Sequence, residues 1–315
     1  MHIVIYKWRT SHHFLLQHLF PEAEIVQAEP RVDDERIITL AHQIANKHQD
    51  EEAHWFFQIN LSYSEKWLCN RAGTVQALLD LGFHVYNSDV TDIRKRSLQK
   101  LIRKIGLNCV MVDKQDSEAA TPVIVKTNYN YGGEFESTLS PELVRALGFE
   151  SVTGCNIQSF VGYYRTTLAE VDKTIWQDER LVVERYIENS DNRFYRFYRC
   201  GKNAILSEVI NENLIKKIEP GLPRKNWYFE FRKCINHIYQ ELIDSASTLL
   251  DEMGMKFGAV DIVMDDKGRA FIIDVNPTPG WGSENQGKIL SFLRSGVQRT
   301  CESATDSRNL RYEEC

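Results

Sequence analysis

The sequence predicts a mixed α/β fold that begins with a parallel sheet. In the first third of the chain, apolar strand patterns alternate with helical patterns, an order typical of parallel α/β domains. Near the C-terminus, two segments of alternating polarity flank a turn and predict an antiparallel hairpin. The chain has 315 residues, of which 43% are hydrophobic, so it is long enough to bury the cores of two or three subdomains.

Residues 1–90 are expected to form the parallel α/β domain. Apolar residues recur at helical spacing in some of its segments and form short strand-like runs in others. The predicted elements are a strand at 2–6, a helix at 33–47, a strand at 55–59, a helix at 70–81 and a strand near Val85.

Residues 91–187 are expected to form a second domain that carries a flap. An apolar strand at 122–126 ends in Lys126, whose stem can lie along the core while its ammonium projects into a site. Gly132 and Gly133 follow, and without a Cβ they allow backbone N–H groups to approach phosphate oxygens. The alternatives are a lysine that merely ends a strand and an ordinary turn. The other elements expected here are a helix at 141–147 and a strand at 181–188.

Residues 188–299 are expected to form a third domain, followed by a loose tail at 300–315. A strand over 191–199 would place Arg196 on one face and Arg193 on the other. A guanidinium fork suits the charge of a phosphoryl or acyl-phosphate group, because it donates two parallel hydrogen bonds. A long helix is predicted over 229–253.

Arginines interleaved with aromatic residues can also stack on nucleic-acid bases. The chain has 38 Lys and Arg residues against 44 Asp and Glu residues, for a net charge of −6. No basic domain is present to attract a phosphate backbone. Nucleic-acid binding is therefore disfavoured.

The hairpin within residues 258–280 predicts a metal-binding face. An even-length turn would pair 259–264 with 269–274. That register puts Val260, Ile262 and Met264 on one apolar face with Phe271, Ile273 and Val275. The opposite face carries Asp261, Asp274 and Asn276, with Asp261 diagonal to Asp274. Diagonal neighbours lie about 7–8 Å apart, close enough for their oxygens to share a magnesium ion.

The alternative for Asp261, Asp274 and Asn276 is the solvated face of an ordinary hairpin. Two details argue against it. Asp and Asn are unfavourable at mid-strand positions, and the Pro-Gly turn that follows Asn276 fixes where the strand ends.

The hairpin resembles the C-terminal metal-binding strands of the ATP-grasp superfamily, with an acid on one strand, acid-x-Asn on the next and then a Pro-Gly turn. Other segments between about residues 80 and 285 are similar to this family in the expected order. They are Asn87-Ser88 with the helix after Asp92, the strand ending in Lys126, Tyr131-Gly132-Gly133, the segment 181–188 and the strand 191–199.

The resemblance implies a role for each matching residue. Arg94 and Lys126 would hold phosphates, Gly132 and Gly133 would begin the flap, and Asp261, Asp274 and Asn276 would bind the metal. The backbone of Glu184, Arg185, Tyr186 and Ile187 would hold adenine, and either Glu188 or Asp191 would hold the ribose. Arg196, with Arg193 as the alternative, would lie near the transferred phosphoryl group. The fold implied is an ATP-grasp fold preceded by a pre-ATP-grasp α/β domain.

The activity implied is an ATP- and magnesium-dependent ligase, of the glutathione synthetase or ribosomal-protein glutamate ligase type, with manganese as an alternative metal. It would join a small-molecule or peptide carboxylate to an amine through an acyl phosphate and release ADP. A kinase resembling ATP-grasp inositol polyphosphate kinases is the nearest alternative, because Asp274 stands where most ligases have Glu. The other is a nucleotide-binding regulator without turnover. The acid, the amine and the choice between monomer and homodimer stay open.

The chain is expected to be cytoplasmic. No apolar run reaches the length of a membrane span, and the first residues lack the features of a signal peptide. The seven cysteines are scattered and form no CxxC pair, which favours reduced thiols.

Overall fold

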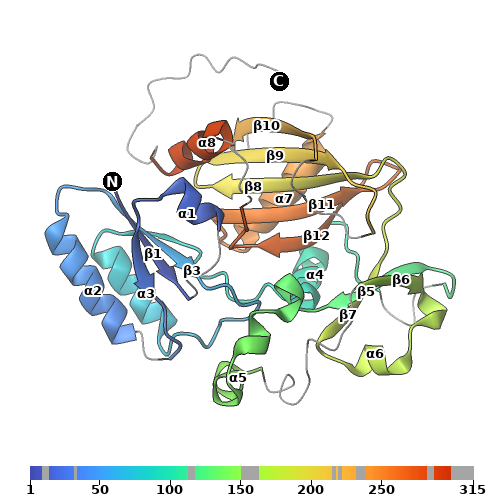
Figure 1. Cartoon of the computed structure of the whole chain (residues 1–315), viewed down its shortest axis with the longest axis horizontal. Coiled ribbons are helices and arrows are strands. Elements are labelled where there is room, and N and C mark those ends of the chain that lie inside the picture. The colour runs from blue at the N-terminus through green and yellow to red at the C-terminus, as the bar shows by residue number, and fades with distance from the viewer. Residues whose placement is uncertain are drawn as a thin grey trace.

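The computed structural model describes residues 1–8, 14–31, 34–112, 118–149, 163–214, 218, 222–231, 239–281 and 287–298. These residues build a parallel sheet of four strands and antiparallel sheets of five and three strands. Figure 1 shows the parallel sheet at the left, the five-stranded sheet at the upper right and the three-stranded sheet at the lower right. The mixed α/β fold predicted from the sequence is confirmed. The expected tail at 300–315 lies outside the described residues.

The parallel sheet forms the N-terminal part of the molecule. Its strands, in the order β2-β1-β3-β4, are β1 (His2–Lys7), β2 (Glu24–Gln27), β3 (Ala53–Gln58) and β4 (His84–Tyr86). Helices α2 (Asp34–Lys47) and α3 (Arg71–Asp80) cover one face, where Val4 and Trp55 share a core with Ile37 and Leu78. The strands and helices predicted within residues 1–90 are therefore confirmed.

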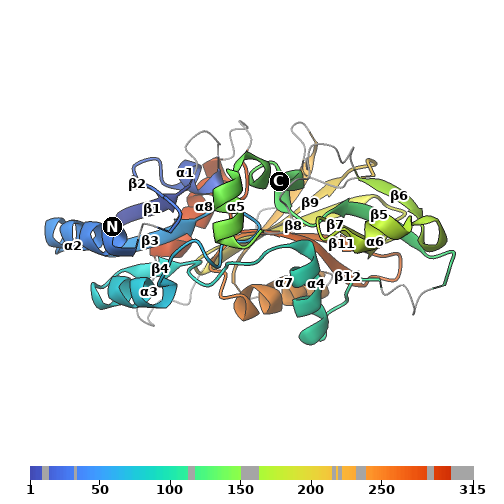
Figure 2. The ribbon, with the colours of Figure 1, turned by 90° about the horizontal axis from the view of Figure 1, so that it is seen from below.

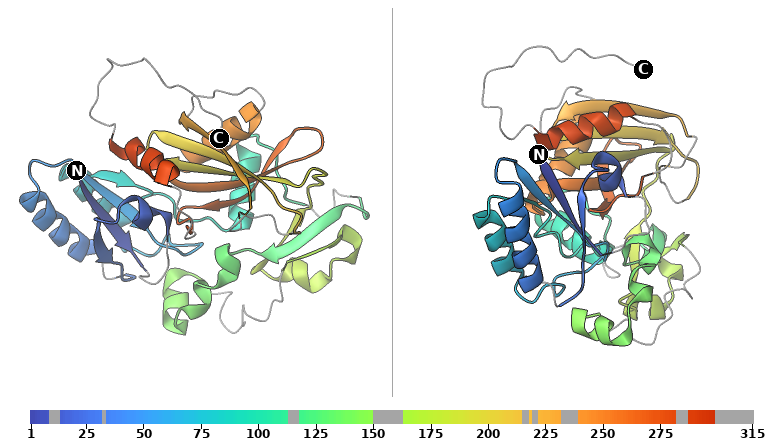
Figure 3. Two further views of the ribbon diagram at one scale, coloured as in Figure 1. Left: turned by 45° about the horizontal axis from the view of Figure 1, so that its top comes forward. Right: turned by 60° about the vertical axis from the view of Figure 1, so that its left-hand side comes forward.

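Helices α1 (Leu15–Leu19) and α8 (Gly287–Gln298) lie between the parallel sheet and the five-stranded sheet. Ile5 of β1 belongs to the same apolar core as Leu293 of α8 and Phe257 of the five-stranded sheet. Figure 3 shows α8, in red, beside the five-stranded sheet and above the blue parallel sheet. This shared core fixes the position of the parallel sheet relative to its neighbour.

The five-stranded sheet has the order β10-β9-β8-β11-β12 and is antiparallel throughout. Its strands are β8 (Arg193–Cys200), β9 (Asn203–Ile210), β10 (Arg224–Glu230), β11 (Phe257–Met264) and β12 (Ala270–Asn276). Helices α4 (Lys95–Lys104) and α7 (Gln240–Glu252) cover one face, and Figure 2 shows them on the same side of the sheet. The helix predicted over 229–253 is wrong at its start, because Phe229 lies in β10.

The three-stranded sheet has the order β6-β5-β7. Its strands are β5 (Pro122–Thr127), β6 (Tyr164–Thr167) and β7 (Leu181–Arg185). Val123, Val125 and Val183 form its small core with Leu168 and Val171. Short helices accompany it: α5 (Pro141–Leu147), α6 (Lys173–Gln177) and the 3-10 turns η1 (Asn130–Gly133), η2 (Glu136–Thr138) and η5 (Leu168–Glu170).

The register predicted for the β11–β12 hairpin is wrong by one residue. Asp265 accepts hydrogen bonds across the turn from Gly268, and its own N–H donates to Arg269, so the loop has three residues rather than an even number. Gly268, at φ 78°, supplies the left-handed residue that this loop requires. Ile262 consequently lies opposite Ile272 and not Phe271.

A β-bulge then shifts the register again between Ile262 and Asp261. Asp261 lies directly opposite Asp274, and not diagonal to it, with Ile273 as the extra residue. Phe271 and Ile273, predicted on the same apolar face as Ile262, instead lie on the opposite face with Val263. Because of the bulge, Val275 lies on the predicted apolar face with Val260 and Ile262. Bulges next to functional sites redirect side chains in this way.

No helix in the part of the chain that the structure describes has both the length and the apolar character needed to cross a membrane.

Candidate active site

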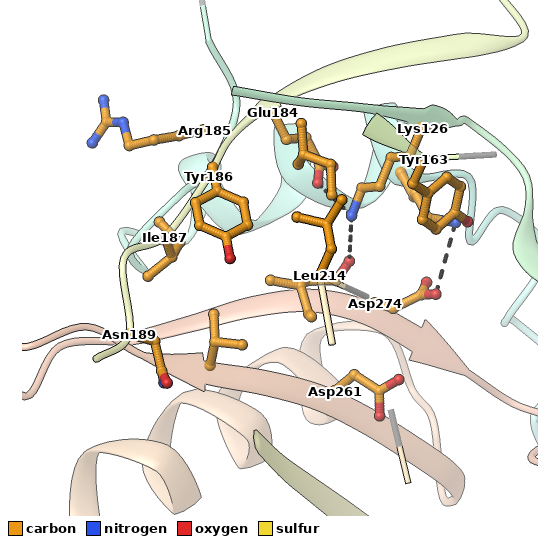
Figure 4. A pocket seen from close by; sticks show the side chains of 14 residues that line it. Lys126, Tyr163, Glu184, Arg185, Tyr186, Ile187, Asn189, Leu214, Asp261 and Asp274 are labelled. Carbon is orange, nitrogen blue, oxygen red and sulfur yellow. Dashed lines mark hydrogen bonds and ion pairs between the residues drawn. The ribbon is translucent and has the colours of Figure 1, made fainter. Parts of the chain in front are cut away.

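A pocket of about 110 Å³ lies between the three-stranded sheet and the β11–β12 edge of the five-stranded sheet. Figure 4 shows Lys126 reaching from the upper sheet toward the strands that carry Asp261 and Asp274. The end of the pocket near Lys126, Asp261 and Asp274 is polar, and the opposite end is mainly apolar. The lining residues are Lys95, Ile124, Lys126, Tyr163, Glu184, Arg185, Tyr186, Ile187, Asn189, Leu214, Asp261, Val263, Ile273 and Asp274.

Lys126 and Glu184 form a buried ion pair on the upper wall of the pocket. They lie on the paired strands β5 and β7, and the ammonium Nζ is 2.5 Å from Glu184 Oε2. Lys126 also donates to the backbone oxygen of Ile273 at 3.2 Å, so it connects the two sheets. Burial raises the pKa of Glu184, and the charge of Lys126 opposes that rise. The second carboxylate oxygen, Oε1, is buried and has no hydrogen-bond partner in the described part of the chain.

Lys95, and not Arg94, supplies the second cation of the pocket. Arg94 forms an ion pair with Asp92 at 2.5 Å and lies over the ring of Tyr63, and it does not line the pocket. Lys95 is almost fully buried, donates to Tyr129 O at 2.9 Å and lies 3.7 Å from Asp274 Oδ2. Burial lowers the pKa of Lys95, but Asp274 and other nearby acids more than offset this, so the net shift is upward.

The position of Lys95 follows from helical spacing. Lys95, Leu98, Gln99 and Ile102 are the buried residues of α4, at intervals of three and four. The apolar positions Leu98 and Ile102 therefore place residue 95 on the inner face of the helix. The sequence contains this helical spacing, but the resemblance to the family motif predicted Arg94 instead.

Arg196 forms a two-pronged ion pair with Asp261. The two residues are cross-strand partners on β8 and β11. Nε donates to Oδ1 at 2.5 Å and Nη2 donates to Oδ2 at 2.8 Å. Burial lowers the pKa of Arg196, but the charge of Asp261 outweighs it and raises the pKa further above its ordinary value. Neither Arg196 nor Arg193 lines the pocket, but Arg196 holds Asp261, which does. Arg193 is more exposed and pairs with Asp191 and Glu208.

Asp261 and Asp274 face each other directly across β11 and β12. Two carboxylates in this arrangement repel one another, and the positive charges of Arg196 and Lys95 lie beside them. Their donor atoms are all oxygen, which suits magnesium. Among the described residues, no group of three His, Cys, Asp or Glu side chains is arranged to hold a metal. A cation shared by the two aspartates would need its other ligands from water or phosphate and would compete with Arg196, which donates to both oxygens of Asp261.

Both polar atoms of the Asn276 side chain, the third predicted metal ligand, form hydrogen bonds with Thr278 and Tyr131. Its Oδ1 accepts hydrogen bonds from the backbone N–H of Thr278 at 2.9 Å and from the Thr278 hydroxyl at 3.3 Å. Its Nδ2 donates to the hydroxyl of Tyr131 at 2.8 Å. The residue thus closes the turn after β12, and it does not line the pocket.

The Gly132 and Gly133 segment also lies away from the pocket. Tyr131, Gly132 and Gly133 all have positive φ angles, and the Tyr131 hydroxyl donates to Thr278 O at 2.8 Å. Neither glycine lines the pocket. The segment contacts the end of β12 through the Tyr131 hydroxyl.

The apolar end of the pocket lies beside the connection from β7 to β8. Two of the backbone groups predicted to hold adenine are already used, because Arg185 N–H donates to Val110 O and Tyr186 N–H donates to Pro122 O. Within the described residues, Ile187 N–H has no hydrogen-bond partner. Figure 4 shows the Arg185 side chain directed away from the other labelled residues.

Neither Glu188 nor Asp191 lines the pocket. Glu188 pairs with Arg165, and Asp191 pairs with Arg193 at 2.9 Å. Asn189 lies there instead, with its Nδ2 donating to the backbone of Arg193 and Met264 and its Oδ1 buried without a partner. No pattern in the sequence distinguished Asn189 from its acidic neighbours.

No family model and no curated protein matches the sequence. Several solved structures are similar to the chain. An L-amino acid ligase from Bacillus licheniformis is 11% identical over 88% of this chain and 68% of that chain, with a TM-score of 0.45. D-alanine–D-alanine ligase from Bacillus anthracis, complexed with ATP, is 12% identical over 89% and 87%, with a TM-score of 0.43. The ATP-grasp ligase PsnB, complexed with a precursor variant, Mg and ADP, is 10% identical over 94% and 98%, with a TM-score of 0.47.

Proposed function

We propose that the protein is an ATP- and magnesium-dependent ligase that joins a carboxylate to an amine through an acyl phosphate. The observation that carries this proposal is the two-ended pocket between the sheets. Lys95 and Lys126 converge at one end with Asp261 and Asp274, and Tyr186, Ile187, Leu214 and Val263 line the other. A nucleoside triphosphate has the same polarity, with an apolar base at one end and a chain of phosphates at the other.

The base would lie against the apolar end. Ile187 N–H, which has no partner among the described residues, can donate to a ring nitrogen. The unpartnered Oδ1 of Asn189 can accept a hydrogen bond from a ribose hydroxyl or an exocyclic amine. These two groups replace the acidic residues and the wider backbone set expected from the sequence.

The charges of the polar end support a requirement for a divalent cation. Lys126 is paired with Glu184, Arg196 with Asp261, and Lys95 lies near Asp274. The cations are thus already balanced by acids, and a triphosphate would add several negative charges. A magnesium ion on Asp261 and Asp274 would neutralise phosphate charge as it shifts during transfer.

The protein's own residues would position the reactants. Lys126 and Lys95 would hold phosphate oxygens by charge-assisted hydrogen bonds. A substrate carboxylate oxygen would bond to the γ-phosphorus as ADP leaves. An amine would then attack the acyl carbon, lose a proton and expel phosphate. Arg196 would hold the Asp261 carboxylate in a fixed orientation throughout.

Hydroxylamine trapping tests the proposal. The protein is incubated with ATP, magnesium, hydroxylamine and a panel of amino acids and peptides, and hydroxamate and ADP are measured together. A ligase forms both in equal amounts, because hydroxylamine intercepts the acyl phosphate. ADP with a stable phosphorylated product would instead identify a kinase. Tight ATP binding with neither product would identify a regulator.

A further inference from the structure

Each of the three side chains predicted from the sequence to bind a metal is engaged by a side chain from another element. The pairs are Asp261 with Arg196, Asp274 with Lys95, and Asn276 with Tyr131. A divalent cation at this end of the pocket would therefore compete with the protein's own side chains for its ligands. The three competing side chains differ in how firmly the fold holds them.

Arg196 and Lys95 are fixed by regular secondary structure. Arg196 lies within β8, between β9 and β11, and donates two hydrogen bonds to Asp261. Lys95 belongs to the inner face of α4, is 2% exposed and also donates to Tyr129 O at 2.9 Å. Neither side chain can leave its partner without disturbing a packed element.

Tyr131 is held less firmly. It is 40% exposed and lies in the short turn η1, where two glycines follow it. Its hydroxyl donates to Thr278 O at 2.8 Å and accepts from Asn276 Nδ2 at 2.8 Å. Its ring packs edge-on against Phe135 with a centroid distance of 5.1 Å. The hydroxyl contacts thus connect a surface turn to the end of β12.

The backbone of Tyr131 is strained. Its φ of 48° and ψ of 31° lie in the left-handed region, which is unfavourable for a bulky aromatic residue. Such conformations persist where surrounding contacts hold them, and they are common in switch regions. The hydrogen bonds to Thr278 and Asn276 oppose relaxation of this turn. Their loss would therefore favour movement of Tyr131 away from β12.

Asn276 lies on the same face as the two aspartates. It follows Asp274 by two positions on β12 and pairs with Ala259, so it is a diagonal neighbour of Asp261. Its Oδ1 accepts a 2.9 Å bond from Thr278 N–H and a longer bond of 3.3 Å from the Thr278 hydroxyl. An amide oxygen has two lone pairs, so a cation can replace the longer bond while the shorter one stays.

We propose that Tyr131 is a latch that competes with a divalent cation for Asn276. With the latch closed, the bond from Nδ2 to the Tyr131 hydroxyl fixes the plane of the amide and keeps Oδ1 on Thr278. With the latch open, Oδ1 is free to bind the cation together with Asp274. The inference rests on the proposed ligase function and adds regulation of its metal site. Because the cation binds the open form, the closed latch weakens its apparent affinity.

The first test measures metal binding. Mn²⁺ is titrated into the protein with and without saturating ADP, and the unbound ion is counted by electron paramagnetic resonance against a titration without protein. Tyr131→Phe keeps the ring beside Phe135 and removes the hydroxyl that holds Asn276. The variant should bind Mn²⁺ about tenfold more tightly than the wild type, because the hydrogen bonds that close the latch are gone.

Tyr63→Phe is the matched control for this titration. The Tyr63 hydroxyl donates to Glu65 at 2.8 Å, so its removal leaves Asn276 and Tyr131 unchanged. The control should bind Mn²⁺ as the wild type does. An equal gain in both variants would overturn the latch.

The second test determines whether the gain depends on Asn276. Asn276→Ala should weaken Mn²⁺ binding, because it removes the oxygen that the latch controls. Adding Tyr131→Phe to Asn276→Ala should then change the Mn²⁺ dissociation constant by less than about twofold, because the two positions act as one pair. A gain that persists without Asn276 would overturn the inference.

The third test uses the wild-type protein and needs no variant to fold. Tetranitromethane nitrates tyrosine through the ionised phenol, and donation to Thr278 O favours the neutral form of Tyr131. Saturating magnesium should therefore speed the nitration of Tyr131, measured by mass spectrometry with Tyr63 as the internal reference. An unchanged or slower rate would overturn the latch.

The outcomes separate the latch from the proposed function. Wild-type protein that binds ATP and Mn²⁺ with the same affinities as Tyr131→Phe overturns the latch and leaves the ligase proposal standing. Wild-type and variant proteins that bind ATP but no Mn²⁺ also overturn the latch. Failure of the wild-type protein to bind ATP overturns the proposed function itself.

Discussion

Arg196 and Asp261 lie opposite one another on β8 and β11 and form a two-pronged ion pair at the edge of the pocket. We expect Arg196→Lys to lower turnover by about a hundredfold or more, because a single ammonium cannot hold both oxygens of Asp261. Arg193→Lys is the control, since Arg193 is more exposed and pairs with Asp191 and Glu208 instead of Asp261. Steady-state rates of both variants decide between the two arginines. A larger loss in the Arg193 variant would reverse the assignment.

Substitutions of Lys126 and Glu184 should show that Lys126 contributes separately to the stability of the fold and to the binding of ATP. Lys126→Met leaves Glu184 buried without its cation, so the free energy of unfolding should fall by about 3 kcal/mol. The double variant Lys126→Met with Glu184→Leu should regain most of this stability, because both charges are gone. ATP binding should stay lost in both. Urea unfolding and calorimetric ATP titration measure the two effects, and an ATP affinity restored in the double variant would contradict the role of Lys126.

Lys95 and Arg94 offer a test at neighbouring positions. Lys95→Met should weaken ATP binding by about tenfold, because it removes a charged donor that lines the pocket. Arg94→Met should change the dissociation constant of ATP by less than about twofold, because Arg94 is engaged by Asp92. The opposite ranking of the two dissociation constants would favour the assignment made from the motif.

Asp274→Asn should abolish turnover without unfolding the protein. The change removes a carboxylate from the proposed metal pair and relieves its repulsion with Asp261, but it also takes the carboxylate away from buried Lys95. These opposing effects should keep the change in the free energy of unfolding below about 2 kcal/mol. Asp266→Asn, in the exposed hairpin turn, is the control and should keep full activity. Measurable turnover of Asp274→Asn at saturating magnesium would count against the metal assignment.

Stability should decrease in acid because of His54. Its side chain is buried in β3, and burial lowers its pKa to about 4, with Glu52 opposing and His84 reinforcing the shift. The unfolded chain binds the proton near the ordinary value of 6.5, so the native state loses stability as pH falls from about 6.5 to 4, by up to about 3 kcal/mol. Urea midpoints at pH 8, 6.5 and 5 should decline less in His54→Phe than in the wild type. Parallel declines would exclude His54 as the source.

Periodicity predicted most of the fold because it is a local property. The strand ending in Lys126 and the helix at residues 141–147 both form where apolar spacing and turn residues indicated. Phe229 was misassigned because an apolar and aromatic run fits both a strand and a buried helix. Its position in β10 is decided by pairing with Ala204 of β9, which no local window contains.

The sequence predicted those site residues that strand patterns place, but not those whose position depends on tertiary contacts. Lys126, Asp261 and Asp274 line the pocket as expected, because each sits at a position that its strand pattern defines. Asn276 and the two glycines do not, because hydrogen bonds with Tyr131 and Thr278 engage that segment elsewhere. Asn189 was missed because only the folded structure shows that it lines the pocket with an oxygen that is buried and unpaired among the described residues.

The extra residue Ile273 keeps Asp274 out of the core. If plain alternation continued through Ile273, Asp274 would lie opposite Val260 and point to the side occupied by Val260 and Ile272. Deleting Ile273 would remove the bulge but leave Asp274 opposite Asp261. Homologous chains with and without this residue should therefore both keep the two aspartates on one face.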